Sequence, residues 1–577
     1  MAPHAQLDAA GGSTTRALIL LFALFLGAGH ASSQATTPAS SGSQKIKALY
    51  DAGQWSDIVR MVPESSAEPA DLELYRGLAL AQLGQYALAE RALKAGYLGH
   101  PKDARFLTEL AGIAYRDKRF SIAKLELRHA LAINPKDDYS NNFLASIYFL
   151  EGNLEAALKY WNRVGKPKLR DLEYDPIPNL DPLILDQAFR FSPDMVWTRN
   201  RFLTTKAELA SLDLFPHTFY ELQAQQDGAF DLVWHDSQRS RWQDFKWATI
   251  APMLRGLPYL SVYPEFYNLN GKGLNWLSFV RWDDQKRWFS SELSAPLAAN
   301  PKERLRLYFE DRNENWNVTS RILPFSDSPA GFNVRRTAID IGLHSISSWR
   351  WQSNVDAEYS YRNFRSLAGI PQAAAPFFTD SSAIALRTSV EHPFIRFPER
   401  RFSLDAALAG EAGKFFSSPL GKYVRVEGSL TADWLPQARG EDYEMKIRLR
   451  SGGTAGQIPF DDLFMLGFDR DNDLWLRGHN DLRNGQKGNA PMGRDFVLTN
   501  ADIEKVLFND GLFLVKAGPF VDTGNIYDSS QFFGSPKWLT DTGLQTTVKI
   551  LGRFEFVLGY GKDLRSGNNT FYSSVSR

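Results

Sequence analysis

The sequence predicts a multidomain protein with three successive parts: an all-α solenoid of helical repeats, a small α/β module and a C-terminal antiparallel transmembrane β-barrel of about 16 strands. Small residues recur at a fixed spacing between positions 44 and 171, which is typical of stacked helix pairs. A helix pattern followed by an Asp-Gly hairpin occupies residues 179–240. From residue 250 to 577, short segments of alternating polarity follow one another with no convincing helix pattern.

Composition excludes several classes of protein. Lys plus Arg equals Asp plus Glu at 66 each, so no net charge favours a nucleic-acid partner. The chain has no cysteine, which excludes a disulfide scaffold, a Cys-ligated zinc site and a thiol nucleophile. Aromatic residues make up 13% of the chain, which suits the interfacial girdles of a membrane barrel and also a soluble carbohydrate-binding protein.

Residues 1–35 have the pattern of a secretory signal peptide. Arg16 ends a polar lead, residues 17–29 form an apolar run, and small residues for cleavage follow at 29–31 or 33–35. The apolar run is too short for a membrane-spanning helix. The sequence therefore predicts export.

The helical part, residues 44–171, repeats with a period of about 34 residues, which is the tetratricopeptide spacing. Residues 44–69 fit as a degenerate first unit, and a plain helical bundle is the alternative. Stacked helix pairs leave a concave groove for a partner protein. We assign this groove to the repeat positions Gly77, Tyr86, Ala111, Phe120 and Tyr148.

The α/β module is predicted as a strand at residues 184–191, an apolar-striped helix at 203–214 and a hairpin of residues 218–224 and 229–235. Asp227-Gly228 supplies the hairpin turn. This order is similar to a POTRA domain, the module that precedes outer-membrane assembly barrels. The resemblance implies a strand edge that receives extended client segments; the alternative is a spacer domain with a covered edge.

The C-terminal part reads as successive strands joined by polar turns. About 320 residues at ~20 per strand and turn correspond to roughly 16 strands of a membrane barrel. A soluble sandwich or propeller is the competing all-β fold. The predicted strands are 274–282, 287–297, 304–310, 336–344, 349–361, 383–392, 402–409, 423–434, 444–449, 496–508, 512–521, 543–551, 554–560 and 571–575.

Four motifs then occur in a characteristic order. They are residues 263–266 followed by Gly271 and Gly273 in a turn after the first strand; residues 459–467; Leu476, Arg477, Gly478 and His479; and Phe520, Asp522 and Gly524 on a strand. This series resembles the BamA/TamA-type outer-membrane assembly barrels.

In that family a long loop folds back into the barrel, and its Arg meets a strand Asp across the lumen. The resemblance therefore implies that Arg477 pairs with Asp522, since a carboxylate is a planar, two-pronged acceptor for a desolvated guanidinium. Gly478 would allow a sharp turn beside the arginine. The alternative is a surface loop with a solvated Arg477.

Catalytic and metal-binding patterns are missing from the sequence. The nine histidines show no zinc-protease spacing, and nucleophile-elbow, Walker and dinucleotide motifs are absent. Residues 469–473 lack the glycine and distal Glu of a calcium loop and are expected to form a hydrated loop. Asp461 and Asp462 are likewise expected on the hydrated surface. We predict no metal, no cofactor and no enzymatic activity.

The resemblance implies a bacterial outer-membrane protein that inserts or translocates other proteins. Its partners would be the outer-membrane lipid bilayer, client proteins with β-strand segments, and a periplasmic protein bound to the repeat array. Clients would template on a weakly paired seam between the first and last strands, because unpaired backbone groups in lipid cost several kcal/mol each. The alternatives are an exopolysaccharide or solute export pore with a tetratricopeptide scaffold, and an adhesin or scaffold.

Overall fold

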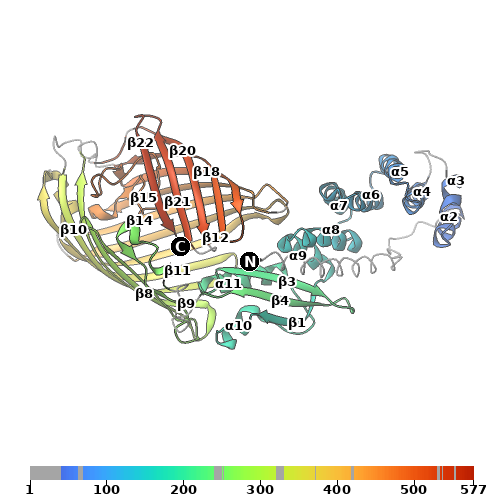
Figure 1. The fold of residues 1–577 in the computed structure, drawn as a ribbon, viewed down its shortest axis with the longest axis horizontal. Coiled ribbons are helices and arrows are strands. Elements are labelled where there is room, and N and C mark those ends of the chain that lie inside the picture. Colours follow the sequence, from blue (N-terminus) through green and yellow to red (C-terminus); the bar gives the residue numbers. More distant parts are fainter. Residues whose placement is uncertain are drawn as a thin grey trace. The chain divides into compact units, whose positions relative to one another are not determined.

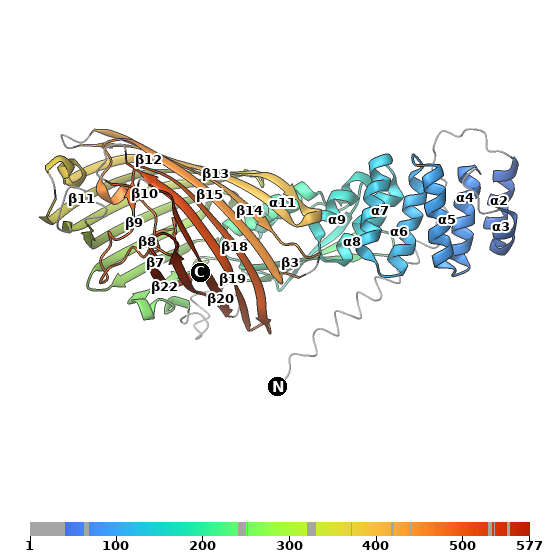
Figure 2. The ribbon, with the colours of Figure 1, turned by 90° about the horizontal axis from the view of Figure 1, so that it is seen from above.

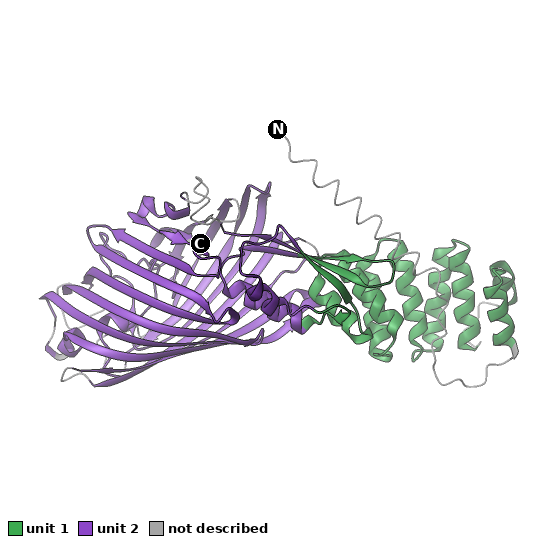
Figure 3. Ribbon diagram, turned by 90° about the horizontal axis from the view of Figure 1, so that it is seen from below, with its two compact units in different colours: residues 1–173, 192–199, 220–233 green, residues 174–191, 200–219, 234–577 purple. Residues whose placement is uncertain are grey.

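The computed structural model describes residues 41–62, 69–239, 250, 252–319, 330–370, 372–416, 421–438, 440–528, 533–535, 537–550 and 554–576. The chain divides into two compact units, coloured in Figure 3, one of residues 1–173, 192–199 and 220–233 and the other of residues 174–191, 200–219 and 234–577. The predicted signal peptide, residues 1–35, lies outside the described residues. Within the described ranges, no helix has the length and apolarity needed to cross a bilayer.

The described part of the first unit begins with eight helices that follow one another as a row in Figure 2. Buried small and aliphatic residues pack the helices together, and Asp103, Asp137 and Asn153 cap three helix N-termini by accepting hydrogen bonds from backbone amides. The helices are α2(Ser41–Asp51), α3(Trp55–Met61), α4(Ala70–Gln82), α5(Tyr86–Gly99), α6(Ala104–Arg116), α7(Phe120–Ile133), α8(Asp138–Leu150) and α9(Leu154–Trp161).

The turn inside each helix pair explains why glycine recurs in the sequence. Gly53, Gly84 and Gly152 adopt φ values of 74°, 75° and 79°, the left-handed region that glycine enters without steric cost. Lys118 occupies the corresponding turn between α6 and α7 at φ 59°. The repeat therefore encodes one left-handed residue for each helix pair.

A four-stranded sheet follows, with strand order β2-β1-β4-β3. Its elements are β1(Lys168–Asp175), α10(Pro182–Phe189), β2(Met195–Val196), α11(Arg199–Ser211), β3(His217–Ala224) and β4(Phe230–Ser237). The predicted helix and hairpin are present at α11 and at β3–β4, where Gly228 takes φ 82° in the turn.

The strand predicted at residues 184–191 is wrong, because this segment forms helix α10. The Asp181 side chain accepts a hydrogen bond from the Leu183 amide at 3.0 Å, and Pro182 occupies the first helical turn, where its missing N–H costs nothing. The buried residues recur at helical spacing: Ile184, Leu185, Ala188 and Phe189. The apolar run has the length of a strand, but the N-cap residue Asp181 and Pro182 before it favour a helix.

Sixteen further strands form one antiparallel sheet that curves into a barrel in Figures 1 and 2. Each of the fourteen predicted segments falls on a separate long strand. The strands are β5(Ser261–Val262), β6(Glu265–Phe266), β7(Asn275–Trp282), β8(Lys286–Leu297), β9(Asn300–Val318), β10(Ala330–Ser348), β11(Trp351–Ala368), β12(Ser381–Phe397), β13(Phe402–Phe415), β14(Lys422–Trp434), β15(Tyr443–Gly456), β18(Asp495–Asn509), β19(Phe513–Tyr527), β20(Leu539–Ile550), β21(Phe554–Asp563) and β22(Asn569–Ser576).

Alternation along the strands separates an apolar outer face from a charged inner face. On β9, Leu305 and Leu307 are 44% and 45% exposed, while Arg304 and Glu310 are buried. Aliphatic side chains continue the outer face on β10, β12 and β14, and include Ile339, Ile341, Ile384, Leu386, Val424 and Val426. The period of two places charge inside the barrel and leaves an apolar wall outside.

Candidate functional site: the loop inside the barrel

The loop of residues 457–494 joins β15 to β18 and folds back against the inner face of the barrel wall. It contains the 3-10 turn η6(Phe460–Asp462) and a two-stranded ribbon, β16(Phe464–Met465) and β17(Met492–Gly493). Leu474 and Leu476 are buried against wall residues Phe496, Leu498, Ile526 and Leu539. Apolar packing thus places the Leu476–His479 motif against β18, β19 and β20.

Arg477 makes the densest set of polar contacts in the motif. Its Nε and Nη2 donate to the two oxygens of Asp522 at 2.9 and 2.6 Å, and its backbone amide donates to Asp522 Oδ2 at 3.0 Å. Its Nη1 donates to Asp502 and Gln545 at 2.5 and 3.1 Å. The guanidinium carbon lies 3.8 Å from the centre of the Phe520 ring. The structure therefore brings Arg477, Asp522 and Phe520 together as a two-pronged ion pair over an aromatic face.

Glycine is required at position 478 because there is no room for a side chain, not because the backbone turns sharply there. A Cβ at this position would lie 2.6 Å from Asp541 Cγ and 2.7 Å from the Asp563 backbone nitrogen. Its amide donates to Asp541 Oδ2 at 2.6 Å, and its carbonyl accepts a hydrogen bond from Thr570 at 2.9 Å. The loop backbone therefore rests directly on β20, β21 and β22.

Gly524 and the predicted turn glycines have different surroundings. A Cβ on Gly524 would lie 3.0 Å from the Val497 carbonyl, so this residue is also a close-contact position on the wall. Gly271 and Gly273 lie between β6 and β7 at φ 72° and 75°. The Gly271 carbonyl accepts a hydrogen bond from the Asp181 amide at 2.7 Å, which links this turn to the start of α10. Gly271 and Gly273 therefore lie apart from the contacts that Arg477 makes in the loop.

Asp461 and Asp462 were expected on the hydrated surface, and that expectation is wrong. Arg362, on β11, donates to both oxygens of Asp461 at 3.1 and 3.0 Å and also bonds Asp462, and the Arg362 and Asp461 side chains are fully buried. Phe460, beside them, packs on Trp316 and Phe332 of the wall. The sequence around Asp461 and Asp462 could not predict their burial, because their partner Arg362 lies about a hundred positions away in the chain.

Residues 469–473 are likewise not simply a hydrated loop. Asp469 is 1% exposed and lies 3.2 Å from Lys487 Nζ, and Asp471 accepts a hydrogen bond from Arg281 at 3.0 Å and forms an ion pair with Lys286. Arg470 and Asp473 match the expectation: both are exposed, and the Asp473 side chain is 83% exposed. The loop is thus anchored by ion pairs to β7 and β8 as well as to β11.

The first strand expected at residues 263–266 is present in part as β6, and with β5 it forms a short segment before β7 at one end of the barrel sheet. Ser261 and Val262 pair with Arg281 and Val280, and Glu265 and Phe266 pair with Leu277 and Trp276. Arg255 holds Glu265 through two hydrogen bonds of 3.1 and 2.6 Å. Tyr259 donates to Ser573 of β22 at 2.9 Å, so this segment touches the strand at the opposite end of the sheet.

Three of the five repeat positions assigned to a groove, Gly77, Ala111 and Tyr148, are buried packing residues. A Cβ on Gly77 would lie 2.4 Å from Leu93. Tyr86 and Phe120 are half-buried at the starts of α5 and α7. Repeating small residues indicate where helices touch one another, and a binding surface must use other side chains.

Three tyrosines lie on the first helices of the pairs, Tyr50 on α2, Tyr75 on α4 and Tyr139 on α8. The Tyr50 and Tyr75 rings lie 5.5 Å apart, and Tyr139 is 46% exposed. Glu109 on α6 lies within electrostatic reach of Tyr50 and Tyr139. Burial raises the pKa of Glu109 to about 7, opposed in part by the charge of Arg116.

Comparisons with known proteins complete the description. No protein-family model and no curated protein matches the chain. Among solved structures, BamA from Haemophilus ducreyi lacking POTRA domains 1–3 is similar at 10% identity, with 70% of this chain and 83% of that chain covered and a TM-score of 0.42.

Two further solved structures are similar at comparable levels. CdiB from Escherichia coli matches at 11% identity over 71% of this chain and 76% of its own, with a TM-score of 0.48. CdiB from Acinetobacter baumannii matches at 13% identity over 73% and 81%, with a TM-score of 0.43. At these identities the likeness concerns the fold alone.

Proposed function

We propose that the protein is a bacterial outer-membrane factor that inserts or translocates other proteins. The barrel, residues 250–577, would lie in the bilayer. The repeat array, residues 44–171, and a POTRA-like module, residues 179–240, would lie in the periplasm after removal of a signal peptide at residues 1–35. The alternation of exposed aliphatic residues with buried charges along β9, β10, β12 and β14 supports a lipid-facing outer wall.

The observation that carries the proposal is the end of the barrel sheet. In the described part of the chain, β22 pairs with β21 alone, and the sheet ends on its other side with the two-residue strands β5 and β6. An edge with unpaired backbone groups is strongly driven to pair in lipid, where water cannot satisfy them. A client strand could therefore add to β22 once the segment at residues 252–267 moves away.

The alternative of an export pore is less well supported by the interior of the barrel. The loop at residues 457–494 contacts the wall through Arg362 on one side and Asp522 on the other. A polymer-conducting channel needs an open lumen, whereas this loop crosses it. Steady conductance with glycan selectivity in planar bilayers would nevertheless support the pore.

The test is to lock the end of the sheet. Because the chain has no cysteine, Tyr259→Cys with Ser573→Cys gives a unique pair for a short thiol cross-linker. The variant replaces the native protein in cells, and quantitative proteomics of the outer membrane and surface follows cross-linking. We expect a set of barrel or surface proteins to fall.

The matched control is Thr388→Cys with Gly410→Cys, which cross-links the paired strands β12 and β13 and should leave these proteins unchanged. If the locked variant leaves the protein complement intact while a polymer stops reaching the surface, the barrel is an export pore. If neither protein nor polymer changes, the helical array is the functional end, as in an adhesin or scaffold.

A further inference from the structure

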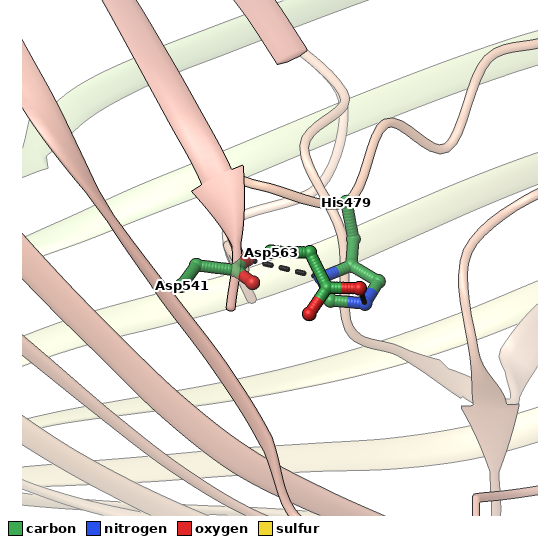
Figure 4. A group of neighbouring side chains, drawn as sticks. All are labelled: His479, Asp541 and Asp563. Carbon is green, nitrogen blue, oxygen red and sulfur yellow. Dashed lines mark hydrogen bonds and ion pairs between the residues drawn. The ribbon is translucent and has the colours of Figure 1, made fainter. Parts of the chain in front are cut away.

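A histidine from the loop, His479, and two aspartates from the wall, Asp541 and Asp563, converge, as Figure 4 shows. His479 Nδ1 lies 3.0 Å from Asp541 Oδ2, and His479 Nε2 lies 3.5 Å from Asp563 Oδ2. One oxygen or nitrogen atom from each side chain lies within 4.8 Å of the others. Sequence spacing could not reveal this group, because its members belong to the loop, β20 and β21.

The wall beneath the loop carries three carboxylates in a row. Asp522 faces Asp541 in the register of β19 and β20, and Asp541 faces Asp563 in the register of β20 and β21. Asp522 and Asp541 are fully buried, and Asp563 is 4% exposed. Like charges directly opposite one another on adjacent strands destabilise a sheet, so this row needs cations.

Arg477 supplies only part of the positive charge. Its guanidinium is used by Asp522 and Asp502. His479 is the remaining group of the motif that faces Asp541 and Asp563, and the Asp541 Oδ1 atom is buried with no hydrogen-bond partner. Buried charges in proteins are paired or coordinate a metal, and a buried carboxylate with one orphaned oxygen, Oδ1, and its other oxygen, Oδ2, beside an imidazole fits the second arrangement.

We propose that His479, Asp541 and Asp563 form a binding site for a borderline divalent transition-metal ion, represented by Zn²⁺. An imidazole nitrogen with two carboxylate oxygens is a zinc donor set, whereas Mg²⁺ and Ca²⁺ prefer oxygen ligands alone. Ligand bonds of ~2.0–2.2 Å place two donor atoms up to roughly 4 Å apart on one ion, so the group closes with shifts under about 1 Å.

The surroundings hold the donors in place. Asp563 Oδ1 accepts a hydrogen bond from the Arg565 amide at 2.8 Å, and Asp541 Oδ2 accepts one from the Gly478 amide at 2.6 Å. Bonds of this kind orient metal ligands. A bound ion would join the loop to β20 and β21 at the point where Gly478 already touches both strands, and would strengthen the attachment of the loop to the wall.

The experiment uses the full chain in detergent, stripped with a chelator and dialysed against Zn²⁺ alone. We expect one zinc ion per chain in the native protein and its loss in His479→Gln. The matched control is His344→Gln, a wall histidine that bonds Asn354 at 2.7 Å and should keep the zinc. Equal zinc content in the native protein and in His479→Gln, or none in the native protein, would overturn the proposal.

A second readout covers the case in which His479→Gln alters folding. Asp541→Asn keeps the shape of the side chain and should bind Zn²⁺ at least ~10-fold more weakly, the scale seen when metal-site support is removed. In the native protein, Zn²⁺ should slow proteolysis of the loop relative to chelator, and in Asp541→Asn this difference should vanish. Identical proteolysis with and without Zn²⁺ in the native protein would contradict the site. The outcome does not depend on what the barrel transports.

Discussion

Arg362 on β11 and Asp461 in the loop form an ion pair in which both side chains are fully buried. On another part of the wall the polarity is reversed, since Arg477 of the loop pairs with Asp522 of β19. These two anchors of the loop are therefore ion pairs of opposite sense, and they add to the pairs that Asp471 forms with Arg281 and Lys286. Because a buried charge that loses its partner is strongly unfavourable, the loop cannot leave the wall at either point without a large cost.

Arg477→Ala should destabilise the barrel. The change leaves Asp522 buried without its guanidinium, and breaking a buried pair from one side costs about 3–5 kcal/mol. Heat-modifiability on gels and thermal unfolding in detergent would measure the loss. Arg335→Ala is the matched control, because Arg335 pairs with Asp311 on an exposed face and should change stability by less than about 1 kcal/mol. Equal unfolding of native protein and Arg477→Ala would remove the case for this anchor.

Asp461→Asn should loosen the other anchor while leaving Arg477 in place. Arg362 would keep only Asp462 as a close carboxylate partner, so protease cleavage within residues 457–494 should become faster. If the two anchors act independently, the double variant Asp461→Asn with Arg477→Ala should lose the sum of the single losses within ~0.5 kcal/mol. A sum that falls well short would mean that the loop moves as one unit after either break.

Gly478→Ala tests whether space at the loop–wall contact is limiting. The added Cβ would come within 2.7 Å of the β21 backbone, and overpacking of this kind costs about 1–3 kcal/mol. Gly410→Ala on β13 is the control, since its nearest atom lies 3.8 Å away. We expect a lowered thermal midpoint for Gly478→Ala only. Similar midpoints for both variants would show that the loop can retreat.

We predict that the stability of the helical array depends on pH through Glu109. Its folded-state pKa of about 7 lies above the ordinary value of 4.5, so the folded state binds more protons than the unfolded state between these values. The free energy of unfolding of the array is therefore highest below about pH 4.5. It falls by roughly 1–3 kcal/mol as the pH rises through 7.

Glu109→Gln removes this dependence. Hydrogen exchange of the α6 amides in the full chain should be slower in the variant than in the native protein at pH 8, once corrected for intrinsic rates. The difference should disappear near pH 5. A native protein whose α6 protection is constant between pH 5 and 8 would show that Glu109 ionises freely.

Local patterns determined much of the architecture. Alternation along the chain located fourteen long strands, and a 34-residue repeat located the helix pairs, because both signals depend on residues close in sequence. The strand predicted at residues 184–191 failed for a related reason: a run of eight residues cannot separate a buried strand from a short helix by periodicity alone.

The residues of the candidate site also fall into those that the sequence marked and those that only the tertiary structure brought together. Through its resemblance to the assembly barrels, the sequence marked Arg477, Gly478, His479 and Asp522 as a set and implied that they lie on a loop and a strand. Only the tertiary structure decided that Asp461 meets Arg362, that Asp541 and Asp563 lie beside His479, and that Tyr259 meets Ser573. These contacts join residues dozens to hundreds of positions apart. Their partners are chosen by the register and curvature of the whole sheet, which leave no local trace in the sequence.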